Sequence, residues 1–486
     1  MNIVVIGHGM VGSRFVEDLI ARDADAHVTI LGREPQGPYN RVLLSSVVAG
    51  KSDPAMLAMS AVDSERAEVL DGVHAIDIDR AARTVTDSRG DVHGYDRLVF
   101  ATGSAARIPD IHGIATDRGL VPGVSVLKDL ADAEGILARL PKARRAVVLG
   151  AGVLGLEVAT GLAARGLSVT LVHHSDRVME RQLGDAAAQI ATGSLHRLGV
   201  NVVTGVSVAQ AIDRRGQLSA VRLTDGSEVL TDLLVMCAGT IPEATLARRA
   251  GLTCERGIVV GHDLASLTDP AIFAIGDCAQ PPEGGSGLVA QGWDQATRLV
   301  DGWTGASVPV TRPAADDPTS IVRVKASGLE VVTMGLSGKF DHGERELRAV
   351  RLADPSIGRF VEVVVSHGLL VGATVVGDKD CAAQLSAMYT RMTPVPADPA
   401  HLIIRPLAGA GPVAAASVED MDDADTVCQC NTVTKGRICA AIAEGCDSVE
   451  DVAKATRAST GCGDCRTNVT RLIEAAHDTK VPALAG

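Results

Sequence analysis

The chain has 486 residues, of which 46% are hydrophobic and 22% charged, and its formal net charge is −13. This length exceeds what one hydrophobic core supports, and the acidic balance excludes nucleic acid and anionic membrane surfaces as partners. The first residues enter an apolar run with no basic region or cleavage site, and no apolar stretch is long enough to span a bilayer. We therefore expect a multidomain cytoplasmic protein without membrane association, in which thiols stay reduced.

The N-terminal part alternates short β-branched runs with helical stretches, which is typical of parallel βαβ units. Ile3–Ile6 predicts a buried strand, Met10–Ala21 a helix and Val28–Leu31 the second strand. The same construction begins again at Ala146–Leu149. This internal repeat predicts two Rossmann-like dinucleotide-binding domains in an α/β fold.

A glycine-rich loop joins the first strand to its helix through Gly7, Gly9 and Gly12. The first glycine allows the tight turn, the second lets the backbone approach a pyrophosphate, and the third lets helix and strand pack closely. Met10 lies between them, where only backbone contact with the ligand is expected. Glu34 stands at the end of the second strand, where an acid accepts hydrogen bonds from a ribose.

A second loop of the same kind follows the strand that opens the repeat. Its glycines are Gly150, Gly152 and Gly155, with Val153 and Leu154 at the start of the helix. Two shorter motifs accompany the loops: the turn at Thr102–Gly103 after one strand, and Gly-Asp, ending in Asp277, after another.

In this order and spacing, the four motifs resemble those of two-dinucleotide flavoprotein reductases. In that family the first loop holds FAD and the second holds NAD(P)H. The resemblance implies an FAD site made of Gly7, Gly9, Met10, Gly12, Glu34, Arg41, Thr102, Gly103 and Asp277. It implies an NAD(P)H site made of Gly150, Gly152, Val153, Leu154, Gly155, Glu157, His173, Arg177 and Gly239.

The end of the repeat's second strand bears on the choice of nicotinamide cofactor. An NADH site normally has an acid there, which binds the 2′-hydroxyl and repels a 2′-phosphate. This chain has His173 and His174 instead, with Arg177 nearby. We therefore expect NADPH to be accepted as well as NADH.

Strand patterns dominate the next part of the chain and predict a small α+β domain over residues 306–405. The expected strands are Ser320–Val324, Glu330–Met334, Phe360–Val365 and Leu369–Val376, with a turn at 366–368 between the last two. An Ala-, Gly- and Pro-rich stretch followed by an acidic run predicts a linker over residues 406–425.

Four cysteines close to the C-terminus form two tight pairs, Cys428 with Cys430 and Cys462 with Cys465. Such pairs fit a disulfide framework, a zinc site, a thioredoxin-like dithiol or an iron–sulfur cluster. A reducing compartment disfavours disulfides, and the C-x-C pair and the long gap disfavour zinc. Three helices are expected around the pairs: Lys435–Glu444 capped by Thr434, one starting at Ser448, and one with Val469, Leu472, Ile473 and Ala476 on one face. The other six cysteines are expected in cores.

Three segments narrow the resemblance: Pro38–Ser46, Met179–Leu183 and the cysteine module. Together they are similar to the N-terminal half of the large subunit of assimilatory NAD(P)H nitrite reductase, and equally to electron-transfer subunits of assimilatory nitrate reductase. The module is similar to bacterioferritin-associated ferredoxin, which implies a 2Fe–2S cluster held by Cys428, Cys430, Cys462 and Cys465. Because the chain ends soon after Cys465, we expect it to lack the sirohaem domain that reduces nitrite.

The expected function is transfer of electrons from NAD(P)H through FAD and the 2Fe–2S cluster. The expected partner is a separate nitrate or nitrite reductase catalytic subunit of molybdenum or sirohaem type. The alternatives are a reductase for another redox partner, such as a ferredoxin-like carrier, and a non-catalytic FAD/zinc redox sensor. The expected domains are FAD-binding (1–108 and 239–305), NAD(P)H-binding (109–238), α+β (306–405), linker (406–425) and a helical 2Fe–2S module (426–486).

Overall fold

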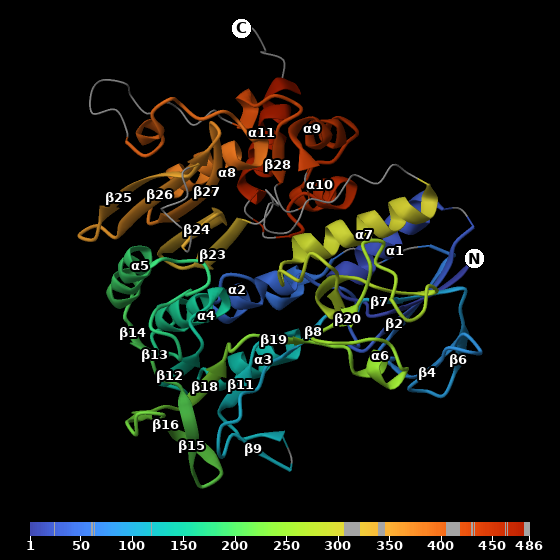
Figure 1. Ribbon diagram of the computed structural model, residues 1–486, viewed down its shortest axis with the longest axis horizontal. Helices are drawn as coiled ribbons and strands as arrows, with labels where there is room; N and C mark the ends of the chain where they lie inside the picture. Colours follow the sequence, from blue (N-terminus) through green and yellow to red (C-terminus); the bar gives the residue numbers. More distant parts are fainter. Residues whose placement is uncertain are drawn as a thin grey trace, which may run out of the picture.

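A computed structural model gives the fold of the chain (Figure 1). It describes residues 1–486 apart from 24, 60–61, 63, 118, 306–320, 339–345, 405–417, 429–430, 432, 462, 464 and 481–486. Within this described part of the chain, no helix combines the length and the apolar composition needed to cross a bilayer.

The first Rossmann domain is a five-stranded parallel sheet in the order β21-β7-β1-β2-β3. Its strands are β1 (Asn2–Ile6), β2 (His27–Gly32), β3 (Ala67–Asp71), β7 (Arg97–Phe100) and β21 (Ile272–Ala274). Helices α1 (Met10–Arg22) and α7 (Val289–Thr304) lie side by side (Figure 1). They bury apolar residues such as Phe15 and Leu299 in the same core as the sheet. The strand β21 joins this sheet from beyond the second Rossmann domain in the chain, so the sheet is built from two separate segments of the sequence.

The second Rossmann domain repeats the arrangement with the strand order β11-β18-β12-β13-β14, all parallel. The strands are β11 (Val124–Val126), β12 (Arg145–Leu149), β13 (Ser168–His173), β14 (Val200–Thr204) and β18 (Leu233–Met236). Helices α3 (Leu130–Arg139), α4 (Val153–Ala164) and α5 (Asp185–Arg197) belong to this domain. In both sheets the strand before the glycine loop is central, which confirms the internal repeat.

A two-stranded antiparallel ribbon carries the chain into and out of the second domain: β8 (Ser104–Ala106) pairs with β19 (Thr240–Pro242). Short elements complete the two domains. They are α2 (Leu44–Val48), α6 (Thr245–Arg249), β4 (Ala75–Asp79), β5 (Thr84–Asp87), β6 (Val92–Gly94), β9 (Ala115–Thr116), β10 (Gly119–Leu120), β15 (Val208–Arg214), β16 (Gln217–Leu223), β17 (Glu228–Leu230), β20 (Ile258–Val259) and β22 (Ala279–Gln280).

The small domain is an antiparallel sheet in the order β23-β24-β27-β26-β25, with α8 (Lys379–Arg391) against it. The strands are β23 (Ile321–Ala326), β24 (Leu329–Gly335), β25 (Arg348–Asp354), β26 (Arg359–Ser366) and β27 (Leu369–Val376). The predicted turn is present, with positive φ at both His367 (48°) and Gly368 (74°), as a two-residue hairpin requires. The sequence missed β25, because this edge strand carries charged residues and lacks a clean apolar alternation.

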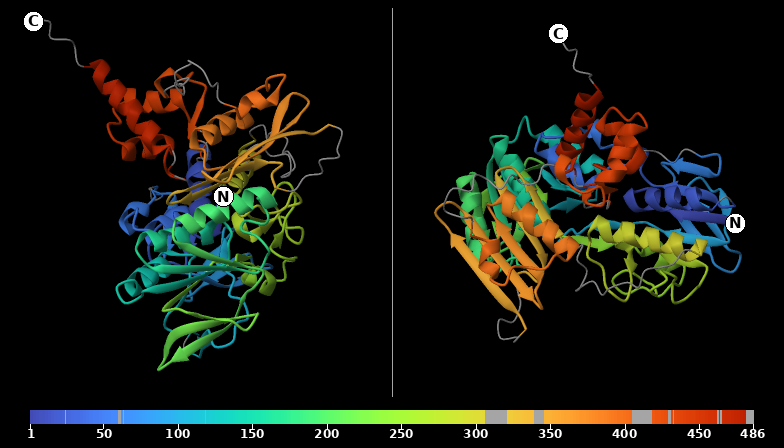
Figure 2. Two further views of the ribbon diagram at one scale, coloured as in Figure 1. Left: turned by 90° about the vertical axis from the view of Figure 1, so that its left-hand side faces the viewer. Right: turned by 90° about the horizontal axis from the view of Figure 1, so that it is seen from above.

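The C-terminal module contains the three helices predicted from the sequence: α9 (Lys435–Ala443), α10 (Val449–Thr456) and α11 (Arg466–Lys480). Thr434 and Ser448 cap the first two through their side-chain oxygens. A hairpin of β28 (Thr426–Cys428) and β29 (Val433–Thr434) precedes α9 and is also part of the module. Figures 1 and 2 place the module above the first Rossmann domain and beside the small domain. The α/β fold class with a small helical module is therefore confirmed.

The boundary of the predicted linker needs correction at its C-terminal end. Residues 418–425 belong to the module, because Val418 is buried in its core and Met421 packs against that core. The Lys435 ammonium donates hydrogen bonds to the carbonyl groups of Glu419 and Met421. These apolar anchors are hidden within an acidic run, which is why composition alone indicated a linker. The rest of the predicted linker, residues 406–417, lies outside the described residues.

Candidate cofactor-binding and electron-transfer site

Both glycine-rich loops open into one cavity of about 1340 Å³ between the two Rossmann domains. A pocket for one small molecule usually measures about 300–1,000 Å³, so this cavity has room for more than one. The carboxyl ends of parallel strands from both sheets meet here, which is where open α/β sheets bind nucleotides. The cavity therefore has the position and the size expected of a site shared by two dinucleotides.

The first loop has the geometry that a pyrophosphate site requires. Gly7 has φ +120°, and a Cβ there would lie 2.2 Å from the Ala101 carbonyl oxygen. A Cβ on Gly12 would lie 2.1 Å from the Gly7 oxygen, so this glycine serves packing. Gly9, by contrast, lines the cavity and has no atom within 4 Å of a Cβ position. The loop thus leaves an open cradle at the N-terminus of α1, where Met10 also faces the cavity.

The second loop reproduces this geometry closely. Gly150 has φ +108°, and a Cβ on it would lie 2.4 Å from the Cys237 carbonyl oxygen. A Cβ on Gly155 would collide with the Gly150 oxygen, whereas Gly152 has open space and lines the cavity. Val153 and Leu154 line the cavity beside it. The two loops are therefore equivalent cradles on opposite domains.

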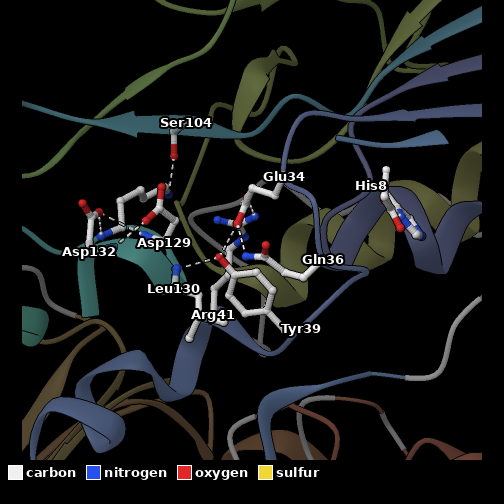
Figure 3. A network of polar contacts seen from close by, with 11 residues as sticks. His8, Glu34, Gln36, Tyr39, Arg41, Ser104, Asp129, Leu130 and Asp132 are labelled. Carbon is white, nitrogen blue, oxygen red and sulfur yellow. Dashed lines mark hydrogen bonds and ion pairs between the residues drawn. The ribbon is translucent and has the colours of Figure 1, made fainter. Parts of the chain in front are cut away.

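A polar network surrounds Glu34 at the end of β2 (Figure 3). Its carboxylate accepts a hydrogen bond from the Tyr39 hydroxyl at 2.7 Å and pairs with the Arg41 guanidinium. The Tyr39 hydroxyl also accepts a hydrogen bond from the Leu130 amide, 2.9 Å away in the second domain. Burial, helped by the bond to Glu34, raises the pKa of Tyr39. Glu34 and Arg41, both assigned to the FAD site by the resemblance, line the cavity.

His8 lies in the same part of the cavity, and sequence reasoning assigned it no side-chain role. Its Nδ1 is 2.7 Å from an Asp71 carboxylate oxygen. Its Nε2 is buried and has no hydrogen-bond partner among the described residues. A buried polar atom without a partner calls for an explanation, and His8 lines the cavity, so a bound ligand is a candidate partner for it. No motif signals this role, because His8 fills a variable position of the glycine loop.

The other predicted flavin residues meet at the ribbon between the domains. Asp277 accepts a hydrogen bond from the Ser104 hydroxyl at 2.6 Å, and the Lys128 ammonium donates to Ser104 at 2.7 Å. Burial lowers the pKa of Lys128, although the adjacent Asp277 opposes this shift. Thr102, Gly103 and Gly239 complete this wall of the cavity.

The strand β13 does not end in an acidic residue, but Glu180 from the following segment lies beside its last residue, His173. The Glu180 carboxylate is 2.8 Å from His173 Nε2, and both residues line the cavity. His173 Nδ1 accepts a hydrogen bond from the Ala151 amide, so its Nε2 carries the proton donated to Glu180. Burial opposes ionisation of Glu180, but the bond from His173, a backbone hydrogen bond and the nearby charges of His173 and His174 together outweigh it, so the pKa of this carboxyl lies below its usual value.

Two predicted NAD(P)H contacts, Arg177 and Glu157, do not bring their side chains to the cavity. The Arg177 guanidinium pairs with Asp176 and Asp185 and donates to the Leu183 carbonyl. Arg177 is therefore a structural residue in the segment between β13 and α5. Its place in the sequence, close to the strand end, did not reveal the direction of its side chain.

Glu157 is the second correction. It is only 5% exposed and accepts hydrogen bonds from the Ser45 hydroxyl (2.5 Å) and the Lys325 amide (2.8 Å). These partners belong to α2 and β23, so Glu157 ties α4 to the first Rossmann domain and to the small domain. Its position one turn into α4 suggested a cofactor contact, but the helix turns this side chain away from the cavity.

The structure brings together two of the four predicted cluster ligands, Cys428 and Cys465. Both are buried, and their thiol groups share a hydrogen bond. This bond and burial raise the pKa of Cys465, so the pair would need a cation to be held as thiolates. Cys430 and Cys462 lie outside the described residues. The donor set that can be seen, two adjacent buried sulfurs, suits a soft metal such as iron in a cluster.

The cavity also contains Cys237, which bears on disulfide chemistry. Burial and the charge of Glu157 raise the pKa of Cys237 to about 12. A thiol with so high a pKa is a poor nucleophile. Among the described residues that line the cavity it is the only cysteine.

The fold and the paired cradles define an NAD(P)H-dependent flavoprotein oxidoreductase with an appended iron–sulfur module. Residues 1–298 match the family model of the pyridine nucleotide-disulphide oxidoreductases, and residues 426–475 match the BFD-like [2Fe-2S] binding domain. The chain belongs to the pyridine nucleotide-disulphide oxidoreductase family. The two matches confirm FAD, NAD(P)H and a 2Fe–2S cluster as the cofactors.

Similar proteins combine these parts in the same way. The chain is 31% identical over 481 residues to the nitrite reductase [NAD(P)H] of Bacillus subtilis (strain 168), covering 97% of this chain and 57% of that protein. It is 31% identical over 482 residues to the assimilatory nitrate reductase electron transfer subunit of the same organism, covering 97% and 59%. The chain therefore spans little more than half the length of these relatives.

A solved structure extends the comparison to the fold. The covalent putidaredoxin reductase–putidaredoxin complex matches with a TM-score of 0.72 and 25% sequence identity, covering 82% of this chain and 95% of that chain.

Proposed function

We propose that this chain is the reductase component of a system that delivers electrons to a separate nitrate or nitrite reductase subunit. The acceptor would carry a molybdenum or sirohaem centre, and the system would work in the cytoplasm. The observation that carries the proposal is the contact of Asn40 with the module. Its neighbours Tyr39 and Arg41 line the cavity, and its side-chain amide donates hydrogen bonds to the carbonyls of Thr460 and Gly461, beside the predicted ligand Cys462.

The chain's own groups bind and orient the cofactors. When bound, FAD takes two electrons as a hydride and releases them singly, which suits a one-electron cluster. The open backbone at Gly9 and Gly152 would receive the two pyrophosphates, and Glu34 would hold the ribose of FAD. Asp277, fixed by Ser104 and Lys128, would meet the polar chain of the flavin. None of these roles requires a general acid or base.

The assays that test this function can also identify a different electron acceptor. A ferredoxin-like carrier is the second candidate, because the structural match includes a reductase joined to its carrier protein. The names of the two relatives favour nitrate or nitrite reduction.

The cofactor content and the direction of electron flow test this function. We expect one FAD and one 2Fe–2S cluster per chain, with NADH bleaching the flavin and producing the paramagnetic signal of a reduced cluster. Flavin and iron analysis with electron paramagnetic resonance measure these results, and coupled assays with each candidate reductase identify the acceptor. Stoichiometric zinc without iron, or a cluster that NADH never reduces, would refute the proposal.

The position of Glu180 changes the expectation for the nicotinamide cofactor. A strand end without an acid predicts that NADPH is accepted. We propose instead that Glu180, held by His173, supplies the missing carboxylate and favours NADH. Its charge would repel a 2′-phosphate by about 1–4 kcal/mol at 4 Å, depending on the local dielectric.

Replacing Glu180 by Gln tests this role. We expect kcat/KM for NADPH to rise by about tenfold, equivalent to about 1.4 kcal/mol, while the value for NADH changes much less. Glu228→Gln is the matched control, since Glu228 lies on the exposed β17 of the same domain and pairs with Arg222. A parent protein that uses both cofactors equally, or a variant without gain for NADPH, would show that Glu180 has no part in cofactor choice.

A further inference from the structure

The iron–sulfur module is held on the first Rossmann domain by a small cluster of alternating charges. The Arg457 guanidinium is 3.0 Å from a Glu17 carboxylate oxygen and 2.7 Å from an Asp18 carboxylate oxygen. Arg14 pairs with Asp18 at 3.2 Å and donates a hydrogen bond to the Asn431 side chain at 3.0 Å. Two cations thus meet two carboxylates between α1 and the module.

These groups are substantially desolvated by the contact. The side chain of Asp18 is 10% exposed and that of Arg14 is 17% exposed. Burial lowers the pKa of Arg14, with the charge of Arg457 as the next cause, and burial raises the pKa of Glu17. A charged group that is largely removed from solvent destabilises the contact when its oppositely charged partner is removed. Removing Arg457 would leave two carboxylates facing one cation.

The backbone of Arg457 is itself unusual. This residue ends α10 with φ +68°, a left-handed conformation that favours glycine. A bulky side chain there costs free energy that a glycine would save. The sequence nevertheless has an arginine, and its side chain reaches the two acids of α1. The arginine at this position therefore makes the contact with α1, although a glycine would be more favourable for the end of α10.

The same contact fixes the loops that carry the predicted cluster ligands. The Asn431 amide donates to the Arg457 carbonyl at 2.9 Å and to the Thr460 hydroxyl at 3.1 Å. Asn431 directly follows Cys430, and Thr460 lies two residues before Cys462. Asn40, which is 4% exposed and stands between the cavity-lining residues Tyr39 and Arg41, donates hydrogen bonds to the carbonyls of Thr460 and Gly461. Arg14 and Arg457 thus contact the loop after Cys430 through Asn431, and Asn40 contacts the loop before Cys462.

We propose that Arg457, Glu17 and Asp18 form a latch that holds the module in the position for electron transfer from the flavin cavity. This inference rests on the proposed function. Each nicotinamide oxidised delivers two electrons, and a 2Fe–2S cluster carries one at a time, so two single-electron transfers must cross this contact in each turnover. Arg457 is a positioning residue, since it acts through the ligand loops.

Arg457→Gly tests the latch without penalising the module, because glycine suits the left-handed helix end. We expect the cluster to keep its content and its paramagnetic signal, and NADH to reduce the flavin at the parental rate. Reduction of the cluster, followed by stopped-flow absorbance, should slow at least tenfold. Arg457→Lys keeps the charge and should restore part of the rate. Hydrogen exchange in α1 should rise in the glycine variant, which reports undocking independently of activity.

Glu17→Gln combined with Asp18→Asn attacks the latch from the other domain and leaves the module untouched. This double variant should slow reduction of the cluster in the same way as Arg457→Gly. It tests the latch even if the Arg457→Gly protein loses its cluster. Parental rates of cluster reduction in this variant would overturn the latch. Failure of NADH to reduce the cluster in the parent protein would instead refute the proposed function itself.

Discussion

Replacing Cys465 by Ser is expected to remove the 2Fe–2S cluster and to reduce electron delivery to the reductase partner to background. Cys465 is buried beside Cys428, and a serine oxygen is a poorer ligand than a thiolate for an iron–sulfur cluster. Flavin content, flavin reduction by NADH and transfer to ferricyanide should persist, because both cradles lie in the Rossmann domains. Metal analysis, electron paramagnetic resonance and the two activity assays measure these outcomes.

Cys439→Ser is the matched control for this experiment. Cys439 lies in α9 of the same module and is half-buried, but it belongs to neither cysteine pair. Its replacement should leave the cluster and electron delivery intact. Delivery that continues in a cluster-free Cys465→Ser protein would identify the flavin as the direct donor and leave the module a structural role.

Replacing Gly152 by Val is expected to abolish productive binding of the nicotinamide cofactor while the protein keeps its FAD. A Cβ at Gly152 meets no protein atom within 4 Å, and its φ of −77° is accessible to any residue. The fold should therefore tolerate the change. The added side chain would occupy the space in which the pyrophosphate approaches the backbone. We expect affinity for NADH to fall at least 100-fold, or about 2.7 kcal/mol.

Gly9→Val is the reciprocal variant, because Gly9 holds the same place in the first loop and is equally open. It should lose FAD and retain NADH binding. Flavin content after purification, titration with NADH and reduction by dithionite separate the two effects. If both variants lost the same cofactor, the assignment of the two cradles would be wrong.

Sequence alone predicted the features that depend on local backbone chemistry. The glycine loops, the two-residue turn at His367 and Gly368, and the caps Thr434 and Ser448 all follow from short-range requirements of φ or of unpaired amides. The strands with strong β-branched patterns were predicted to within a few residues. Edge strand β25 was missed, because it carries charged residues and none of its residues is buried.

The parts that escaped prediction depend on the directions of side chains in the assembled fold. Glu180 reaches His173 from a following loop, and His8, which lines the cavity, contacts Asp71 at the end of another strand. The resemblance implies cofactor contacts at both Arg177 and Glu157. Arg177 instead pairs with Asp176 and Asp185, which are close to it in sequence, and Glu157 binds Ser45 and Lys325, which are far along the chain. The position of a residue in a helix or loop can be predicted from the sequence, but the contacts of its side chain depend on the neighbours that the tertiary fold places around it.

The ribbon of β8 and β19 places the entry and the exit of the second Rossmann domain next to each other. A segment whose ends meet in this way can be replaced by recombination without breaking the host domain. Residues 107–239 therefore form an exchangeable cassette, and nicotinamide preference could be changed by grafting rather than by point substitution. Glu157 sets the main condition for such a graft. A replacement domain would need an acceptor for the Ser45 hydroxyl and the Lys325 amide, or it would leave two donors unpaired at the junction.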